Sequence, residues 1–222
     1  MDRITETIFN RIQPVAPRTF AALAEGAREC RKSLSKLDPA AHPHVWALTT
    51  RAFARESLSA MPLPDGWVVG GNPRLMEQLF LRDEVTGLRM RVLKEVRSVP
   101  GGVPAGSGSN TRKQSWTSPP LQQILPGMPS SEGLRGKTDL SDVELLLLFA
   151  AHYGAGEPGH SLRAVHPLEP GVFGRRVPID LDIHIPPGGD IQLSDVREAF
   201  VGQEAEVDLY AEIDPAERAQ GE

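Results

Sequence analysis

The stretch Leu75-Met-Glu-Gln-Leu-Phe-Leu-Arg-Asp-Glu-Val-Thr-Gly-Leu-Arg-Met-Arg-Val-Leu-Lys-Glu-Val96 contains the strongest local signal in the chain. Two apolar runs, 75–82 and 88–96, flank the five turn-forming residues 83–87, a pattern that predicts a β-hairpin. Successive side chains of a strand point to opposite faces of the sheet. The second strand therefore places Leu88, Met90 and Val92 on one face and Arg89, Arg91 and Glu95 on the other.

The 62 residues at the start of the chain are predicted to be helical. Pro17 suits a first helical position, and apolar residues then recur every three or four positions, a stripe that includes Cys30 and predicts a buried thiol. Asp38-Pro39 is predicted to start a second helix, which ends at the Pro-rich run 61–66. The expected buried stripe of this helix is Val45, Leu48, Thr49, Ala52 and Phe53. Residues 67–71 form a further short apolar run, which predicts a strand.

Residues 98–140 are rich in Gly, Pro, Ser and Thr and predict a long loop, anchored through Trp116, Leu121, Ile124 and Leu125. A loop of this length is often functional, and a plain spacer is the alternative.

After this loop, the apolar run Val143–His152 predicts a fully buried strand, although the capping-box pair Ser141 and Glu144 leaves a helix as the alternative. Short strands are expected over 162–166 and 177–185, followed by a short helix over 193–201. The prediction is one α+β domain over residues 1–222, in which an N-terminal helical pair packs on a mainly antiparallel sheet interrupted by a long Gly/Pro/Ser-rich loop. Its parts are the helical region 1–62, the hairpin region 66–97, the loop 98–140, a second strand region 141–202 and an acidic tail 203–222.

Charge is unevenly distributed along the chain. Residues 82–137 carry nine Lys or Arg against four Asp or Glu, whereas residues 190–222 carry two against ten. This arrangement is typical of solvated faces that happen to cluster along the chain, and two partners or one segment that screens the other are the alternatives. The pI near 5.7 argues against a dedicated nucleic-acid-binding protein, and the acidic end favours contact with a basic protein surface.

Several classes of protein have no motif in this sequence. A single cysteine excludes an internal disulfide and is typical of a cytoplasmic protein, and no apolar run reaches the roughly 18 residues that a membrane span needs. The N-terminal residues lack the pattern of a signal peptide. There is no HExxH, GxSxG or paired-cysteine motif. Gly154–Gly159 matches GxGxxG, but no long helix follows it, which favours a turn.

Asp180, Asp182 and His184 are the candidate metal ligands. Their i, i+2, i+4 spacing would place two carboxylates and an imidazole on one face of a strand, as in a divalent-cation site. Polar residues alternate in the same way on any half-buried strand. A metal-dependent nuclease or hydrolase using these three residues is therefore an alternative hypothesis, and a DNA-binding regulator is a second one.

Three stretches carry a family resemblance: Gly66–Glu95, Glu144–Phe149 and Arg163–Gly171. Together they resemble uncharacterised actinobacterial proteins encoded beside a helix-turn-helix protein with a zinc-peptidase-like domain. Such pairs resemble toxin–antitoxin modules of the Rosmer type, which are linked to phage defence. Because this chain lacks HExxH, the resemblance implies that the neighbouring protein is the peptidase-like toxin and that this chain is the antitoxin.

The sequence hypothesis is thus a cytoplasmic, non-enzymatic protein that binds and neutralises a partner toxin. No cofactor, nucleic acid or membrane is expected to take part. Arg89, Arg91 and Trp116 are the expected partner-binding residues, because arginine and aromatic side chains supply most of the binding energy at protein interfaces.

Overall fold

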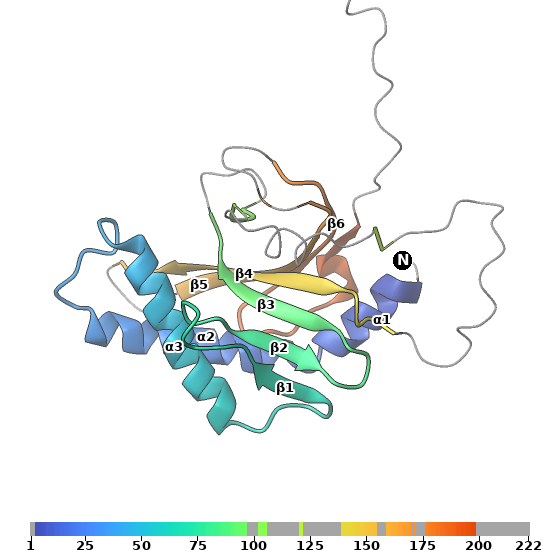
Figure 1. Ribbon diagram of the computed structural model, residues 1–222, viewed down its shortest axis with the longest axis horizontal. Coiled ribbons are helices and arrows are strands. Elements are labelled where there is room, and N and C mark those ends of the chain that lie inside the picture. Colours follow the sequence, from blue (N-terminus) through green and yellow to red (C-terminus); the bar gives the residue numbers. More distant parts are fainter. Residues whose placement is uncertain are drawn as a thin grey trace, which may run out of the picture.

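A computed structural model describes residues 3–96, 102–105, 120–121, 139–154, 159–169, 171 and 176–198. Three helices come first: α1 (Arg3–Ile12), α2 (Ala16–Ser33) and α3 (Pro43–Ala60). The strands follow: β1 (Trp67–Gly70), β2 (Phe80–Asp83), β3 (Arg89–Lys94), β4 (Glu144–His152), β5 (Gly159–Pro167), β6 (Ile179–Ile185) and β7 (Val196–Glu198). The predicted α+β fold, with helices N-terminal to a mostly antiparallel sheet, is confirmed (Figure 1).

The seven strands lie in the sheet in their order along the chain. Every neighbouring pair is antiparallel except β3 and β4, which are parallel and aligned from Arg89 opposite Glu144 to Lys94 opposite Phe149. A parallel pair needs a crossover connection, because the chain must return to the end of the sheet from which it started. The parallel pairing of β3 with β4 is a feature that the composition of the chain did not reveal.

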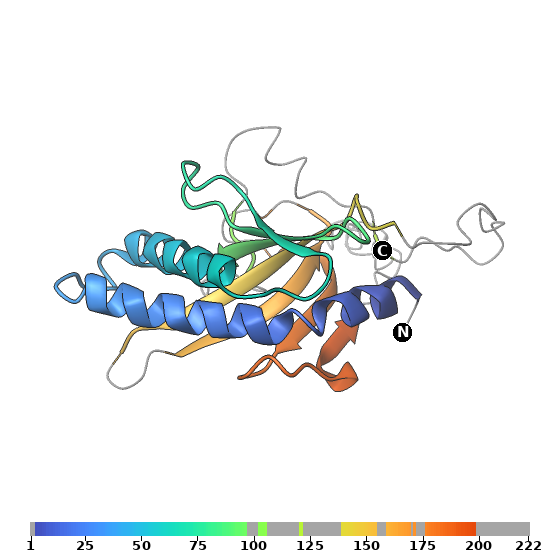
Figure 2. The same cartoon turned by 90° about the horizontal axis from the view of Figure 1, so that it is seen from below.

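All three helices lie on one face of the sheet, as the view from below shows (Figure 2). One continuous apolar cluster joins them to the strands through Ile8, Leu23, Leu58, Met90 and Leu147. A smaller cluster lies on the opposite face and consists of Val103, Leu146, Leu148, Val165 and Val177. Strand β4 is buried on both faces, which explains why its apolar run is continuous.

Helix α3 differs from its prediction in both its start and its buried stripe. Asp38 accepts a hydrogen bond from the Ala40 N–H at 3.0 Å and forms a turn, and the helix starts at Pro43. The buried positions are Trp46, Ala47, Thr50, Ala54 and Leu58, one residue out of step with the predicted stripe. The reason lies in α2: a Cβ on Gly26 would be 2.5 Å from the Thr50 carbonyl, so the helices are packed closely and α3 presents small residues to α2.

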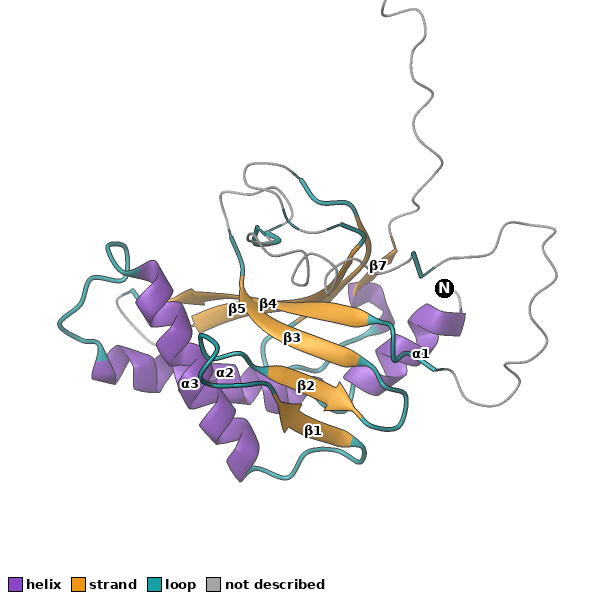
Figure 3. Ribbon diagram, in the orientation of Figure 1, coloured by secondary structure: helices purple, strands orange, loops and turns teal. Residues whose placement is uncertain are grey.

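Strand predictions hold for most of the chain (Figure 3). Strands β1, β4, β5 and β6 lie at the predicted places, and the hairpin of β2 and β3 has the predicted orientation, with Met90 and Val92 in the helix-side core. Two predictions are wrong. Residues 75–79 precede β2 and are not part of it, and residues 193–198 are a 3₁₀ turn followed by β7. The short strand β7 forms because the edge of β6 offers Leu181–Ile183 for pairing.

Candidate functional site

Arg89 and Arg91 project from β3 on the face of the sheet opposite the helices. Both guanidinium groups lie over the ring of Phe80, with their carbon atoms 5.3 and 4.6 Å from the ring centroid, and both pair with Glu144. The Arg91 Nε lies 2.5 Å from Glu144 Oε1. We call Phe80, Arg89, Arg91 and Glu144 the Phe80 cluster.

The two arginines of the Phe80 cluster differ in how accessible they are. Arg91 is only 9% exposed and its side chain packs between Phe80 and Glu144, so it is a structural residue in this conformation and a poor direct contact for a partner. Arg89 and its cross-strand neighbour Arg82 are exposed. Trp116, the third predicted anchor, lies outside the described residues.

Residues 71–79 connect β1 to β2 and enter the sheet directly at Phe80; we call them the Leu75–Met76 loop. Leu75 is 58% exposed and Met76 is 65% exposed. Met76 and Glu77 have φ of 54° and 52°, in the left-handed region that side chains other than glycine disfavour. The loop thus combines two exposed apolar side chains with a strained backbone.

Two arginines of α3 hold this strained backbone in place. Arg51 donates to the carbonyls of Met76 at 2.9 Å and Glu77 at 3.2 Å, and Arg55 donates to the carbonyl of Gln78. At the start of the loop Gly71 has φ of 98°, and a Cβ there would be 2.2 Å from the Gln78 carbonyl oxygen. The loop is therefore closed on itself and clamped to a helix, so Leu75 and Met76 are presented in a defined position.

Asp180, Asp182 and His184 do not come together as predicted. Between β5 and β6 the register shifts at His166 and Pro167, so strict alternation is lost near Asp180. Asp182 pairs with Arg163 at 2.8 Å, and His184 is exposed. Among the described residues no group of three or more His, Cys, Asp or Glu side chains is arranged to hold a metal ion.

Asp180 instead forms a buried pair with His166, which sequence reasoning missed. The two atoms His166 Nδ1 and Asp180 Oδ1 are 2.6 Å apart, and Asp180 Oδ2 accepts a hydrogen bond of 2.8 Å from the Leu121 N–H. Within the described part of the chain, His166 Nε2 has no hydrogen-bond partner. The His166–Asp180 pair holds Leu121 against the sheet. In the sequence, the pair is indicated by one feature, a histidine near the end of an apolar strand.

A second buried carboxylate, Asp83, was also missed because it lies in the predicted turn. Arg11 of α1 contacts it through two hydrogen bonds of 2.6 and 2.7 Å, and the Thr86 hydroxyl donates at 2.6 Å. Burial alone would raise the pKa of Asp83, but the hydrogen bonds from Arg11, Thr86 and the Val85 N–H outweigh it and lower the pKa. This carboxylate stays ionised and fixes the hairpin to α1.

Comparison of the chain with protein-family models, with curated proteins and with solved structures gives no match. In the described part of the chain, none of the helices has the length and apolar character required to cross a lipid bilayer. The surface with the most distinctive geometry is the Leu75–Met76 loop beside the Phe80 cluster, with exposed apolar side chains on a backbone of positive φ.

Proposed function

We propose that this protein is a non-enzymatic binding protein that neutralises or regulates a partner toxin in the cytoplasm, in the manner of an antitoxin. The observation that carries the proposal is the Leu75–Met76 loop, which exposes two large apolar side chains on a backbone that is held in a strained conformation. The resemblance to toxin–antitoxin modules, with their link to phage defence, supports the same role.

A clamped apolar loop supports binding for an energetic reason. Exposed apolar surface gains free energy when a partner removes it from water, at about 25 cal/mol per Å². Because Arg51 and Arg55 already hold the loop, little conformational entropy is lost on association. Strained backbone conformations of this kind concentrate at functional sites.

The exposed charges beside the loop favour a partner surface with acidic groups. Arg74 in the loop and Arg82 and Arg89 on the adjacent strands are all exposed. Complementary charge accelerates encounter and excludes wrongly charged partners, while buried apolar contacts supply most of the affinity. The partner that the resemblance implies is a helix-turn-helix protein with a zinc-peptidase-like domain, and occlusion of its active or DNA-binding surface is the proposed mechanism.

The test is co-expression with the neighbouring gene product, followed by pull-down and a growth assay. Wild-type protein is expected to form a complex and to restore growth. The double variant Leu75→Ser/Met76→Asn removes the apolar surface, and asparagine tolerates the left-handed conformation, so the loop keeps its shape. We expect at least a tenfold loss of affinity and loss of growth rescue.

Leu193→Ser is the matched control, because Leu193 is also exposed, at 61%, but lies on the 3₁₀ turn next to β7 at the other edge of the sheet. This variant is expected to bind normally, and thermal melting checks that all variants are folded. The proposal is wrong if the wild-type protein forms no complex, or if the double variant binds as tightly as the control.

A further inference from the structure

A row of side chains crosses three strands on the face of the sheet opposite the helices, and we call it the arginine row. It consists of Val68 on β1, Arg82 on β2 and Arg89 on β3, which are direct cross-strand partners. Val68 is 37% exposed, and both arginines are exposed. Like charges directly opposite each other on neighbouring strands are unfavourable, so an anion at Arg82 and Arg89 would relieve a repulsion built into the sheet.

Acidic side chains of the described residues do not neutralise this surface. Glu144, the cross-strand neighbour of Arg89, is buried and already paired with it. Within the described part of the chain, neither Arg82 nor Arg74 of the adjoining loop forms an ion pair. The exposed Glu84, which follows β2, offsets one positive charge at most. The surface therefore keeps a net positive charge.

The chain leaves the sheet close to the level of the arginine row, at the opposite edge (Figure 3). One line of directly opposite residues crosses all seven strands: Gly70, Phe80, Arg91, Leu146, Val165, Asp182 and Arg197. Glu198 ends β7 one position nearer to the level of the arginine row. Because neighbouring strands lie about 4.8 Å apart, only the width of the sheet, roughly 24 Å, separates β7 from β2.

Residues 199–222 follow β7 and lie outside the described residues. They include seven Asp or Glu and one Arg. The first three acidic residues come 6–10 positions after the end of β7: Glu204, Glu206 and Asp208. A chain spans up to about 3.3 Å per residue, so ten residues reach as far as roughly 33 Å, enough to cross from β7 to β2. With Val207 among these acids, the segment combines carboxylates with an apolar side chain, as the arginine row combines arginines with Val68.

We propose that residues 204–208, which we call the acidic stretch, dock on the arginine row of their own chain and compete there with the partner. Attachment to the same chain gives the acidic stretch an effective concentration on the order of mM, so even a weak contact is populated. The docking itself needs no partner. Its regulatory consequence rests on the proposed function, because the partner must displace the acidic stretch to reach Arg82, Arg89 and the Leu75–Met76 loop.

A nitroxide label three residues beyond the acidic stretch tests the docking in the full chain. Ala211→Cys supplies the thiol, and Cys30 is fully buried, so the label attaches at position 211. Paramagnetic loss of backbone amide intensity in ¹H–¹⁵N NMR then reports proximity, with the reduced label as reference. We expect about a twofold loss at Val68, Arg82 and Arg89 at low salt, and recovery in 1 M NaCl, where the Debye length is about 3 Å.

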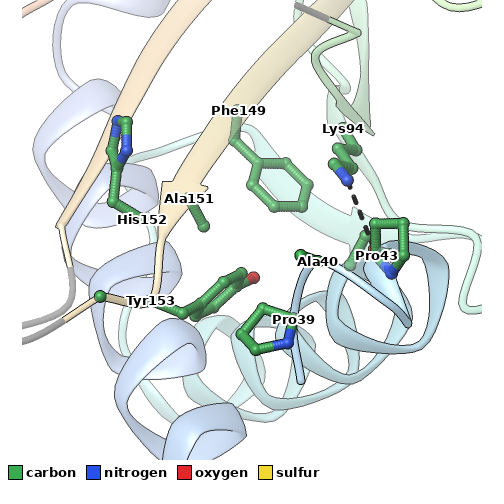
Figure 4. Close-up of a pocket in the computed structure, with 10 residues that line it drawn as sticks. Pro39, Ala40, Pro43, Lys94, Phe149, Ala151, His152 and Tyr153 are labelled. Carbon is green, nitrogen blue, oxygen red and sulfur yellow. Dashed lines mark hydrogen bonds between the residues drawn. The ribbon is translucent and has the colours of Figure 1, made fainter. Parts of the chain in front are cut away.

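The pocket beside Lys94 supplies an amide that should not change. This pocket, of about 410 Å³, lies where the chain ends of β3 and β4 meet the start of α3, with Phe149 in its wall (Figure 4). Gly154, which also lines it, comes ten positions after Glu144, the residue level with Arg89, and so lies roughly 33 Å further along the sheet. Its amide should keep its intensity.

Two matched pairs of variants locate the contact. Glu206→Gln/Asp208→Asn should remove most of the intensity loss, whereas Asp214→Asn/Glu217→Gln takes away the same two kinds of charge further along the chain and should keep it.

On the surface, Arg82→Glu should abolish the loss. Arg197→Glu changes another exposed arginine, on β7 beside the start of the segment, and should leave the loss unchanged. Both substitutions are at exposed positions, so the variants are expected to fold.

Partner binding supplies the regulatory readout. Glu206→Gln/Asp208→Asn should bind the partner about 3–10-fold more tightly than the wild-type protein, because docking reduces the fraction of molecules that is competent to bind. Equal affinities would overturn the competition.

The docking itself is overturned if the labelled wild-type protein shows no intensity loss at the arginine row. It is also overturned if both tail variants abolish the loss equally, since the contact would then depend on net charge alone. If the amides respond as expected and no partner binds, the docking is supported and the proposed function is wrong.

Discussion

On the face of the sheet that carries the helices, side chains from all three helices and most strands form one apolar cluster, whereas on the opposite face ion pairs lie beside a much smaller aliphatic cluster. There Arg89 and Arg91 share Glu144, and Arg163 bridges Glu95 and Asp182. The helix face is thus held together by aliphatic packing, while the opposite face near β3 and β4 holds paired charges, of which Arg91 and Glu144 are buried and Arg89 is exposed.

The largest expected effect comes from two neighbouring residues of β4 that are both buried but face opposite sides. Leu147 belongs to the helix-side cluster and Leu148 to the small cluster. Leu147→Ala should lower the free energy of unfolding by about 4 kcal/mol, and Leu148→Ala by about 2 kcal/mol, because a small cluster can collapse around the cavity. Urea denaturation measures both, and equal losses would contradict the division.

The ion pairs on the two faces should also differ in their contributions. Arg11→Met leaves the fully buried Asp83 without its cation and should lower the free energy of unfolding by about 3 kcal/mol. When the pH is lowered, the wild-type protein should lose more of its stability than this variant does. The sign follows from the lowered pKa of Asp83: the carboxylate contributes above its unfolded pKa, and the contribution disappears as pH falls through the folded pKa.

Arg91→Met is the counterpart on the other face, and it should cost about 2 kcal/mol, less than Arg11→Met, because the buried Glu144 keeps Arg89 as a cation partner. Urea denaturation at pH 7 compares the two variants. A loss for Arg91→Met as large as that for Arg11→Met would show that Arg89 does not compensate for the missing Arg91 charge.

Stability should fall between pH 6.5 and pH 4 because of His160, whose ring stacks on Phe20 of α2 with 4.1 Å between centroids. Burial, and then the nearby His152, lower its pKa to about 4. In this window the unfolded chain binds a proton that the folded state does not, so stability decreases as pH falls. Because the ring is partly exposed, we expect a loss of about 1–2 kcal/mol.

His160→Phe should remove this part of the pH dependence, as measured by thermal melting at pH 7 and pH 4.5. His184→Phe is the matched control: His184 is exposed, and its replacement should leave the pH profile unchanged. Identical profiles for wild type and His160→Phe would show that His160 does not titrate in this way.

The smallest expected effect concerns the Leu75–Met76 loop. Met76→Gly should stabilise the protein by up to about 1 kcal/mol, because glycine adopts φ of 54° without strain. Leu75→Gly is the control and should give no gain, since Leu75 does not have a positive φ. A loss of stability in Met76→Gly would mean that the loop is not strained.

Regular patterns made much of the fold predictable. The hairpin was predictable because the alternation of Leu88, Met90 and Val92 with arginines is a local property of a half-buried strand. The burial of Cys30 and the burial of β4 followed from periodicity and from an unbroken apolar run. For the candidate site, sequence alone indicated Arg89 and Arg91 on one face but not their shared carboxylate, Glu144, which lies 53 residues from Arg91.

The remaining features depend on contacts between residues distant in sequence. Which residues of α3 are buried depends on the close packing of that helix against Gly26 of α2. Residues 75–79 do not join β2, because Arg51 and Arg55 donate hydrogen bonds to carbonyls in this segment. Asp180 does not lie with the other candidate metal ligands, because the register of β5 and β6 shifts near it and it pairs with His166 instead.

The sequence by itself therefore determined most of the strands, the face that each hairpin side chain takes and the uneven charge, since these follow from the chemistry of near neighbours. Only the tertiary structure decided the parallel pairing of β3 with β4, the clamped Leu75–Met76 loop and the pocket beside Lys94. The strand pairing and the clamped loop arise where groups from separate segments form hydrogen bonds with one another. The pocket arises where separate segments do not fill the space between them. No local sequence pattern encodes which segments will meet.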